Sequence, residues 1–177
     1  MALRDVAKAL HRVESVFRRR PQAGLHDDAL ATARWERDTR VTAIHANGIS
    51  VPTDMPTEFG GSGDQVSPGW LFRAGLASCA ATCIVFRAAA AGIELNELEI
   101  VAASRSDSRG LLAMNDANGN AVCSATRDLE LRIRIVARGV SGEQLRSLVQ
   151  AGLEISPVYA ALRGAVPIGV HIDTGAS

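Results

Sequence analysis

The chain has 177 residues with 19 basic and 19 acidic side chains, and hydrophobic residues make up 47% of it while aromatic residues make up 4%. This length suits one domain with a substantial core and at most a short extra arm. Because the formal net charge is zero, the chain lacks the positive field that attracts phosphate backbones, and nucleic acid is not expected as a partner.

The three cysteines, Cys79, Cys83 and Cys123, do not have the spacing of a disulfide framework, and no secretory signal precedes them. We therefore expect free thiols and a location in the reducing cytoplasm. The four histidines are scattered without the spacing of metal ligands, and no Gly-rich segment fits a phosphate loop, so neither a metal nor a cofactor is expected. The histidines are His11, His26, His45 and His171.

Residues 1–20 carry apolar side chains at helical spacing, interrupted by charges, which predicts a helix and not a signal peptide. The run Arg18–Arg20 stands before Pro21, where cations complement a helix dipole, so a membrane or nucleic-acid patch is the less favoured interpretation. We predict that residues 1–28 form an N-terminal helical arm and that residues 29–177 form the main domain.

Two apolar segments, residues 29–35 and 40–46, flank a turn at Arg37, Asp38 and Thr39, which predicts a β-hairpin. Asn47 and Gly48 begin the next turn. The following segment, VPTDMPTEFGGSGDQVSP, gathers proline and glycine and is expected to form an exposed or active-site loop.

Ser67 and Pro68 match an N-cap and a first helical residue, and Gly92 matches a C-cap, so one long helix is predicted between them. Its uncharged part, residues 74–86, is shorter than the roughly 20 residues that span a bilayer, and no membrane span is expected. The helix is apolar nearly all round, which predicts a buried central helix. One sheet and two short helices in a chain of this size are not expected to cover all its apolar sides, so a second copy of the chain is expected to cover the rest.

Strands are predicted at residues 95–104, 129–136 and 166–172, the last as an edge strand because Pro167 and Gly169 interrupt it. Ser141 and Gln144 form a capping-box pattern that begins a helix, and Pro157 restarts or kinks it. The order of elements predicts an α+β fold with antiparallel pairing.

Cys79 lies about three turns into the long helix, where the dipole of the helix start no longer lowers a thiol pKa. Activation would need an arginine or histidine from another segment or subunit. A thiol buried among alanines without such a cation would serve packing alone, and both interpretations stay open on chemistry. A disulfide between Cys79 and Cys83, four residues apart on one helix, is not expected.

The segment FGGSGDQVSPGWLFRAGLASCAATCIVFRAAAAGI resembles the signature of the OsmC/Ohr superfamily, and the likeness extends to ERDTR before it and to GVSGEQLRSLVQAGLEISPVYAAL after it. The resemblance implies an OsmC-like fold: an antiparallel sheet, a long buried central helix and an intertwined homodimer with active sites at the interface. It implies reduction of organic hydroperoxides by a cysteine thiolate, with Cys79 as the attacking residue and Arg37 as the arginine that stabilises it.

Two positions depart from the family pattern. Gly69 stands where the family has a glutamate that orients the arginine, and Ser156 stands where it has the second cysteine. A single-cysteine peroxidase with an external thiol reductant, or with Cys83 or Cys123 as the second thiol, remains open, and Glu58 is a candidate for the missing carboxylate. The alternative is a catalytically inactive dimeric module that binds a small hydrophobic molecule at the subunit interface.

Overall fold

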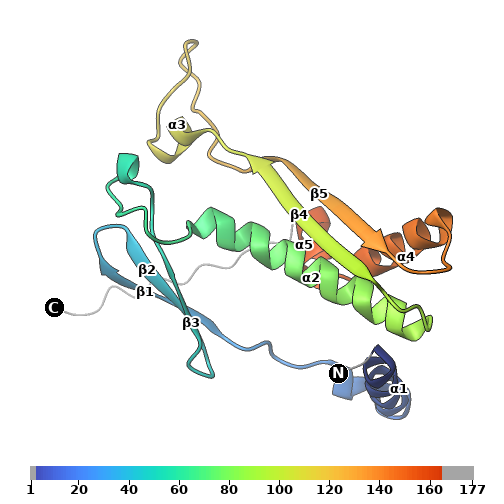
Figure 1. The fold of residues 1–177 in the computed structure, drawn as a ribbon. Coiled ribbons are helices and arrows are strands. Elements are labelled where there is room, and N and C mark those ends of the chain that lie inside the picture. The colour runs from blue at the N-terminus through green and yellow to red at the C-terminus, as the bar shows by residue number, and fades with distance from the viewer. Residues whose placement is uncertain (1–2, 165–177) are drawn as a thin grey trace.

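Residues 3–164 of the computed structural model are described here, and one long helix lies at their centre (Figure 1). The helices are α1 (Leu3–Arg19), α2 (Pro68–Ala90), α3 (Ser108–Leu111), α4 (Gly142–Glu154) and α5 (Pro157–Gly164), with short 3-10 turns η1 (Pro21–Gly24) and η2 (Thr57–Phe59). The strands are β1 (Ala31–Arg37), β2 (Arg40–His45), β3 (Ser50–Thr53), β4 (Glu97–Arg105) and β5 (Arg127–Val136). The predicted α+β class with antiparallel pairing is confirmed.

Helix α2 has the predicted ends. The Ser67 side chain accepts a hydrogen bond from the backbone N–H of Trp70, Pro68 is the first helical residue, and Gly92 follows the helix at φ 66°. One side of the helix is buried, through Leu76, Ala80, Cys83, Ile84, Ala88 and Ala89. The predicted burial on all sides is not found within one chain, because α1, β4, α4 and α5 cover only part of the circumference. Three large side chains therefore stay exposed on α2: Trp70, Phe72 and Phe86.

By length and composition, α2 is the only helix in residues 3–164 that could cross a membrane. A core helix of a folded domain meets the same criterion, and α2 packs against four other elements of the chain. The expectation that the protein needs no membrane partner stays a prediction.

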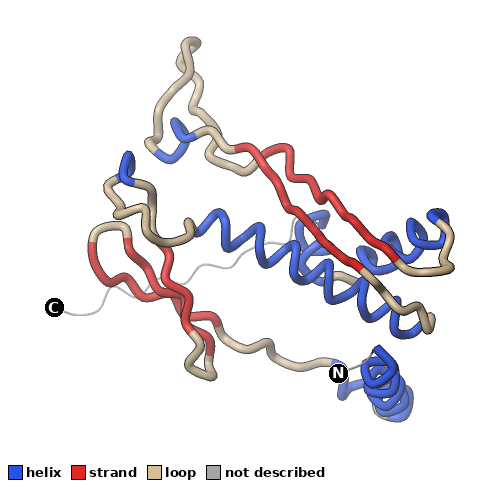
Figure 2. Tube along the Cα trace, viewed as in Figure 1, coloured by secondary structure: helices blue, strands red, loops and turns tan. Residues whose placement is uncertain are grey.

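The five strands form two separate antiparallel sheets on different sides of α2 (Figure 2). In the first sheet β2 lies between β1 and β3, with Ala43 opposite both Ala33 and Val51. In the second sheet β4 pairs with β5, with Ile100 opposite Ile133, and β4 packs on α2. The predicted hairpin at residues 29–46 is confirmed, and its turn places Asp38 at φ 47°.

Strand β3 lies in a segment that was expected to be loop alone. Pro52 has no N–H to donate, so its presence argues against a strand in this segment. Strand β3 lies at the edge of its sheet, where a proline is tolerated. The capping box of Ser141 and Gln144 at the start of α4 is confirmed, and α5 begins at Pro157 as predicted. The strand predicted at 166–172 lies outside the described residues.

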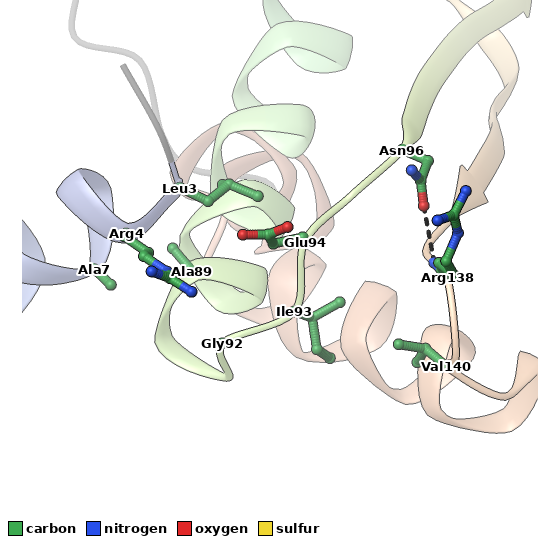
Figure 3. A pocket seen from close by; sticks show the side chains of 10 residues that line it. All are labelled: Leu3, Arg4, Ala7, Ala89, Gly92, Ile93, Glu94, Asn96, Arg138 and Val140. Carbon is green, nitrogen blue, oxygen red and sulfur yellow. Dashed lines mark hydrogen bonds between the residues drawn. The ribbon is translucent and has the colours of Figure 1, made fainter.

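The N-terminal helix α1 is strongly amphipathic and contacts α2, but none of its residues is buried. A cavity of about 650 Å³ lies between α1, the end of α2 and the segment leading into β4 (Figure 3). Arg4 lines it from α1, Glu94 from the segment after α2, and Arg138 from the turn after β5. The division into an arm and a domain at residue 28 stays a prediction.

Candidate active site

The central feature of the site is a contact between the thiol of Cys79 and the hydroxyl of Ser156. Cys79 lies in the middle of α2 and Ser156 lies between α4 and α5, and Ser156 Oγ is 3.3 Å from Cys79 Sγ. Cys79 is partly exposed, whereas Ser156 has no exposed surface. The structure therefore brings the candidate attacking cysteine against the residue that replaces the second cysteine of the family pattern.

The close approach of α4 to α2 makes this contact possible. Gly152 of α4 lies on Ile84 of α2, and a Cβ built at Gly152 would lie 2.5 Å from Ile84 Cγ1 and 2.8 Å from its Cα. No side chain fits between the helices at this point. The end of α4 is thus held against α2, and the residues that follow it, Ile155 and Ser156, come to lie beside Cys79 and Cys83.

Cys83 lies one turn after Cys79 and is buried. Its thiol donates a hydrogen bond to the carbonyl oxygen of Ile155 over 3.7 Å. Burial raises the pKa of the Cys83 thiol, and the neighbouring Cys79 sulfur raises it further. Cys83 is thus held in its protonated form, which is a poor nucleophile. The three cysteines form no disulfide, as expected for Cys79 and Cys83, and Cys123 lies exposed in the loop before β5.

The two sulfurs open onto a mainly apolar groove of about 470 Å³. Its lining is formed by Ser78, Cys79, Thr82, Cys83, Phe86, Ile155 and Pro157. The hydroxyls of Ser78 and Thr82 bond to carbonyl oxygens of their own helix, so they offer the groove little polarity. Such a groove can admit a small apolar molecule and bring it to the Cys79 sulfur.

Arg37, the predicted thiolate-stabilising residue, lies at the end of β1 and is exposed. Within residues 3–164 its side chain makes no hydrogen bond or ion pair, and no arginine donates a hydrogen bond to Cys79. A single chain therefore does not bring the two predicted site residues together. Glu58, the candidate carboxylate, is exposed in η2, where its only described partner is the Thr57 hydroxyl at 3.4 Å.

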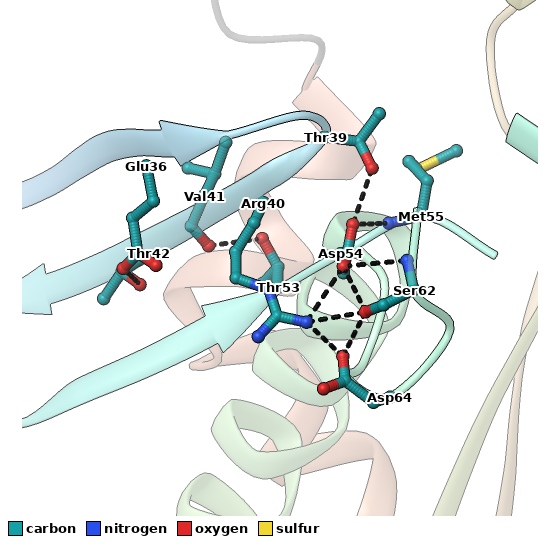
Figure 4. Close-up of polar contacts among 10 residues, drawn as sticks. All are labelled: Glu36, Thr39, Arg40, Val41, Thr42, Thr53, Asp54, Met55, Ser62 and Asp64. Carbon is teal, nitrogen blue, oxygen red and sulfur yellow. Dashed lines mark hydrogen bonds and ion pairs between the residues drawn. The ribbon is translucent and has the colours of Figure 1, made fainter. Parts of the chain in front are cut away.

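The second arginine of ERDTR, Arg40, has a different environment (Figure 4). Its guanidinium bonds to Asp54 Oδ2 at 3.1 Å and to Ser62 Oγ at 2.6 Å, and it pairs with Asp64. The side chains of Arg40 and Asp54 are 14% and 3% exposed. These contacts hold Arg40 in a structural cluster through Nη2, while its Nε is buried without a partner in the described part of the chain. Arg37, which is exposed, is the one of the two that remains available to another group.

Asp54 is the centre of this cluster. It accepts hydrogen bonds from the hydroxyls of Ser62 and Thr39, at 2.7 and 2.6 Å, and from the backbone N–H of Ser62. These bonds hold the pKa of Asp54 far below its ordinary value of 3.8. The cluster ties the turn after Arg37 to the loop that leads into α2. The cluster is not predicted from the sequence, although an Asp before a Gly- and Ser-rich loop is a recognisable turn-forming signal.

Gly69 occupies the second position of α2, where the family pattern has a glutamate. A Cβ at this position would lie 3.7 Å from Nη1 of Arg73, and this same nitrogen donates to Ser104 Oγ over 3.3 Å. A Cβ therefore fits at this position without a clash, but the helix start presents no carboxylate.

A family model described as OsmC-like protein matches residues 61–171, well over half of the chain. The chain belongs to the OsmC-like protein family. Cys79, Ser156 and the whole of α2 lie inside the matched region, whereas Arg37 precedes it. No curated protein matches this chain significantly.

Solved structures of the family share its fold. An organic hydroperoxide resistance protein from Legionella pneumophila is 22% identical, with 79% of this chain and 92% of that chain covered and a TM-score of 0.57. An OsmC-like protein from Mycoplasma pneumoniae is 19% identical, with 79% and 90% covered and a TM-score of 0.64. A putative organic hydroperoxide resistance protein from Vibrio cholerae, with captopril in one of its active sites, is 22% identical, with 79% and 88% covered and a TM-score of 0.53. At these identities the likeness establishes the fold, and the activity has to be argued from the residues of the site.

Proposed function

We propose that this OsmC-like protein is a thiol-dependent peroxidase that reduces organic hydroperoxides with a single reactive cysteine, Cys79, and an external thiol. The observation that carries the proposal is the partly exposed Cys79 sulfur at an apolar groove, with a serine in place of a second cysteine. An apolar groove suits the organic part of a hydroperoxide, and an open sulfur suits attack on its oxygen.

In the proposed cycle the Cys79 thiolate attacks the terminal oxygen of the hydroperoxide. An S–O bond forms and the O–O bond breaks, so that sulfur is oxidised to a sulfenic acid and the alkoxide takes up a proton to leave as an alcohol. A small external thiol then condenses with the sulfenic acid and releases water. A second molecule of that thiol regenerates Cys79 and leaves as a disulfide.

The external thiol is part of the proposal because neither remaining cysteine suits an internal second step. Cys83 is buried and held protonated, and Cys123 lies in the loop before β5 with no described contact to the groove. Ser156 is placed for an internal step but has no redox chemistry.

We also propose that the working unit is a homodimer in the cytoplasm, in which Arg37 of one subunit reaches Cys79 of the other. Trp35 is 70% exposed, and helix α2 exposes three large aromatic side chains, Trp70, Phe72 and Phe86. Several exposed apolar side chains on one element are typical of an interaction surface. A second copy that covers these surfaces would also supply the cation that Cys79 does not contact within residues 3–164.

The test uses the reduced full-length protein with cumene hydroperoxide, and measures peroxide consumption with a monothiol and with a dithiol. Trapping with dimedone and peptide mapping locates the sulfenic acid. We expect turnover with both reductants and trapping at Cys79, loss of both in Cys79→Ser, and retention of both in Cys123→Ser. Oxidation of Cys79 no faster than in the urea-unfolded chain would exclude the peroxidase.

Two observations favour a second candidate function. No guanidinium contacts Cys79 within the described residues, and the groove beside Cys79 is mainly apolar. The protein would then bind a small hydrophobic molecule without turnover. Saturable binding of an environment-sensitive apolar dye, displaced by cumyl alcohol and unaffected by Cys79→Ser, together with no peroxide consumption, would favour this function over the peroxidase.

A further inference from the structure

The hydroxyl of Ser156 is one of the most secluded polar groups in the described chain, with an exposed fraction of 0% for the residue. A buried hydroxyl must give its proton to a protein acceptor, because water cannot reach it. This hydroxyl donates a hydrogen bond to the sulfur of Cys79 over 3.3 Å, and it also interacts with the sulfur of Cys83.

The backbone on both sides of Ser156 is fixed. Its N–H donates to the carbonyl oxygen of Leu153 at 3.1 Å, and its own carbonyl oxygen accepts from the N–H of Ala160 at 2.9 Å. Pro157 follows and restricts the backbone further. Ser156 Oγ is therefore held in place beside the sulfur before any substrate arrives, which is the condition for an effective electrostatic contact.

The direction of the hydrogen bond follows from the charge on sulfur. A thiolate has no proton and can only accept, so in the reactive form the Ser156 hydroxyl must be the donor. The neighbouring thiol cannot take this role as readily, because Cys83 gives its proton to the Ile155 carbonyl oxygen. Within residues 3–164, Ser156 thus supplies the hydroxyl that donates to the Cys79 sulfur, and the Cys83 thiol is a second neutral group in contact with that sulfur.

We propose that Ser156 is a catalytic residue whose hydroxyl donates a hydrogen bond to the Cys79 thiolate and so increases the fraction of Cys79 that is ready to attack. The inference rests on the proposed function and adds a second source of thiolate stabilisation, which lies in the same chain as the cysteine. Ser156 donates a hydrogen bond and keeps its proton throughout, and the electron balance of the cycle is unchanged.

The experiment measures the rate at which Cys79 is alkylated by iodoacetamide from pH 5 to pH 10. Fragment-ion mass spectrometry of the peptide that holds both Cys79 and Cys83 distinguishes the two sites. The variants are Ser156→Ala, which removes the donor, and Ser156→Thr, which keeps it. Thr53→Val is the matched control, because Thr53 is also buried and its hydroxyl bonds to the Val41 carbonyl oxygen at 2.9 Å, away from the groove. Unfolding midpoints are measured for all variants.

We expect the alkylation profile of Ser156→Ala to move to higher pH, with a rate at neutral pH lower by about three- to tenfold, since hydrogen bonds to charged groups are the stronger ones and a less stabilised thiolate is intrinsically more nucleophilic. Ser156→Thr and Thr53→Val should keep the wild-type profile. Coincident profiles for Ser156→Ala and Thr53→Val would overturn the role of Ser156.

Alkylation requires no peroxide, so the two proposals fail in different ways. A shifted profile in a protein that does not consume cumene hydroperoxide would remove the peroxidase and with it a catalytic role for Ser156. Peroxide turnover with an unshifted profile would remove the role of Ser156 alone and leave the peroxidase in place.

Discussion

Ser156 Oγ lies 3.3 Å from Cys79 Sγ, although 77 positions separate the two residues along the chain. The contact places a hydroxyl, which cannot form a disulfide, where the family pattern has a cysteine. A disulfide bond is about 2.05 Å long, so two sulfurs at these positions would need to approach by only about 1 Å. One substitution therefore decides between a single-cysteine and a two-cysteine site.

The variant Ser156→Cys should convert the site to a two-cysteine cycle. After one equivalent of cumene hydroperoxide, we expect a disulfide between positions 79 and 156 in place of a trappable sulfenic acid. Peroxide consumption should then depend on a dithiol, because a monothiol reduces a protein disulfide less effectively. Non-reducing peptide mapping checks the bond, and Cys79→Ser in the same background is the control. A persistent sulfenic acid at Cys79 would contradict the inferred geometry.

Mixing two inactive variants should restore activity if Arg37 acts across the subunit interface. Arg37→Ala keeps Cys79, and Cys79→Ser keeps Arg37, so a hybrid dimer has one complete site only when the two residues come from different chains. Random exchange of subunits gives half hybrids with one working site each, or about a quarter of wild-type turnover.

The measurement is peroxide consumption before and after the two variants are unfolded and refolded together. Each variant refolded alone is the control. No recovery in the mixture, with light scattering showing dimers, would mean that Arg37 does not serve the partner's cysteine.

Much of the fold follows from local signals in the sequence. The long helix is framed by Ser67, Pro68 and Gly92, and the next helix begins at the capping box of Ser141 and Gln144. These features depend on residues within a few positions of one another, which is why the pattern predicts them. The resemblance to the family additionally predicts the overall architecture, an antiparallel sheet with a long central helix.

The remaining features depend on contacts between distant segments. Asp54 gathers partners that lie 8 to 15 positions away, and the approach of Ser156 to Cys79 needs two helices packed in one particular way. Strand β3 was missed because Pro52 suits an edge strand only once β2 is in place. No local pattern encodes these contacts, so the sequence alone does not predict them.

Gly152→Ala should destabilise the protein, because the new methyl group would lie 2.5 Å from Ile84 Cγ1 and 2.8 Å from the Ile84 backbone. Overpacking of this kind costs about 1–3 kcal/mol of unfolding free energy. Urea unfolding measures the loss. Peroxide turnover should also fall, because a displaced α4 moves Ser156 away from Cys79.

Gly142→Ala in the same helix is the control for Gly152→Ala. A Cβ at Gly142 meets only the flexible end of Arg146, at 3.7 Å. Stability should be unchanged or slightly increased, since alanine favours helix over glycine by up to about 1 kcal/mol. Equal effects of the two substitutions would show that helix contact at Gly152 is not what the protein requires.

Asp54→Asn should weaken the link between the β1–β2 turn and the loop before α2, and it should change how stability depends on pH. Hydrogen bonds from Ser62 and Thr39 keep the pKa of Asp54 far below its ordinary value of 3.8. A depressed pKa means that the unfolded chain binds the proton more readily than the folded one. The stabilisation is therefore fully present above about pH 4 to 5 and is lost progressively as the pH falls below 3.8.

Urea unfolding at pH 7, 5, 4 and 3 checks this expectation. The wild-type protein should lose stability steeply between pH 4 and pH 3, whereas Asp54→Asn should be less stable at pH 7 and should show a flatter decline. Part of the slope remains in the variant, because Asp64 and Asp107 also have pKa values held below 3.8 by their hydrogen bonds.

Asp27→Asn, at an exposed position, is the control and should keep the wild-type slope. Parallel pH profiles for Asp54→Asn and the wild type would mean that the Asp54 cluster does not contribute to folding, and that the turn after Arg37 is held by other contacts.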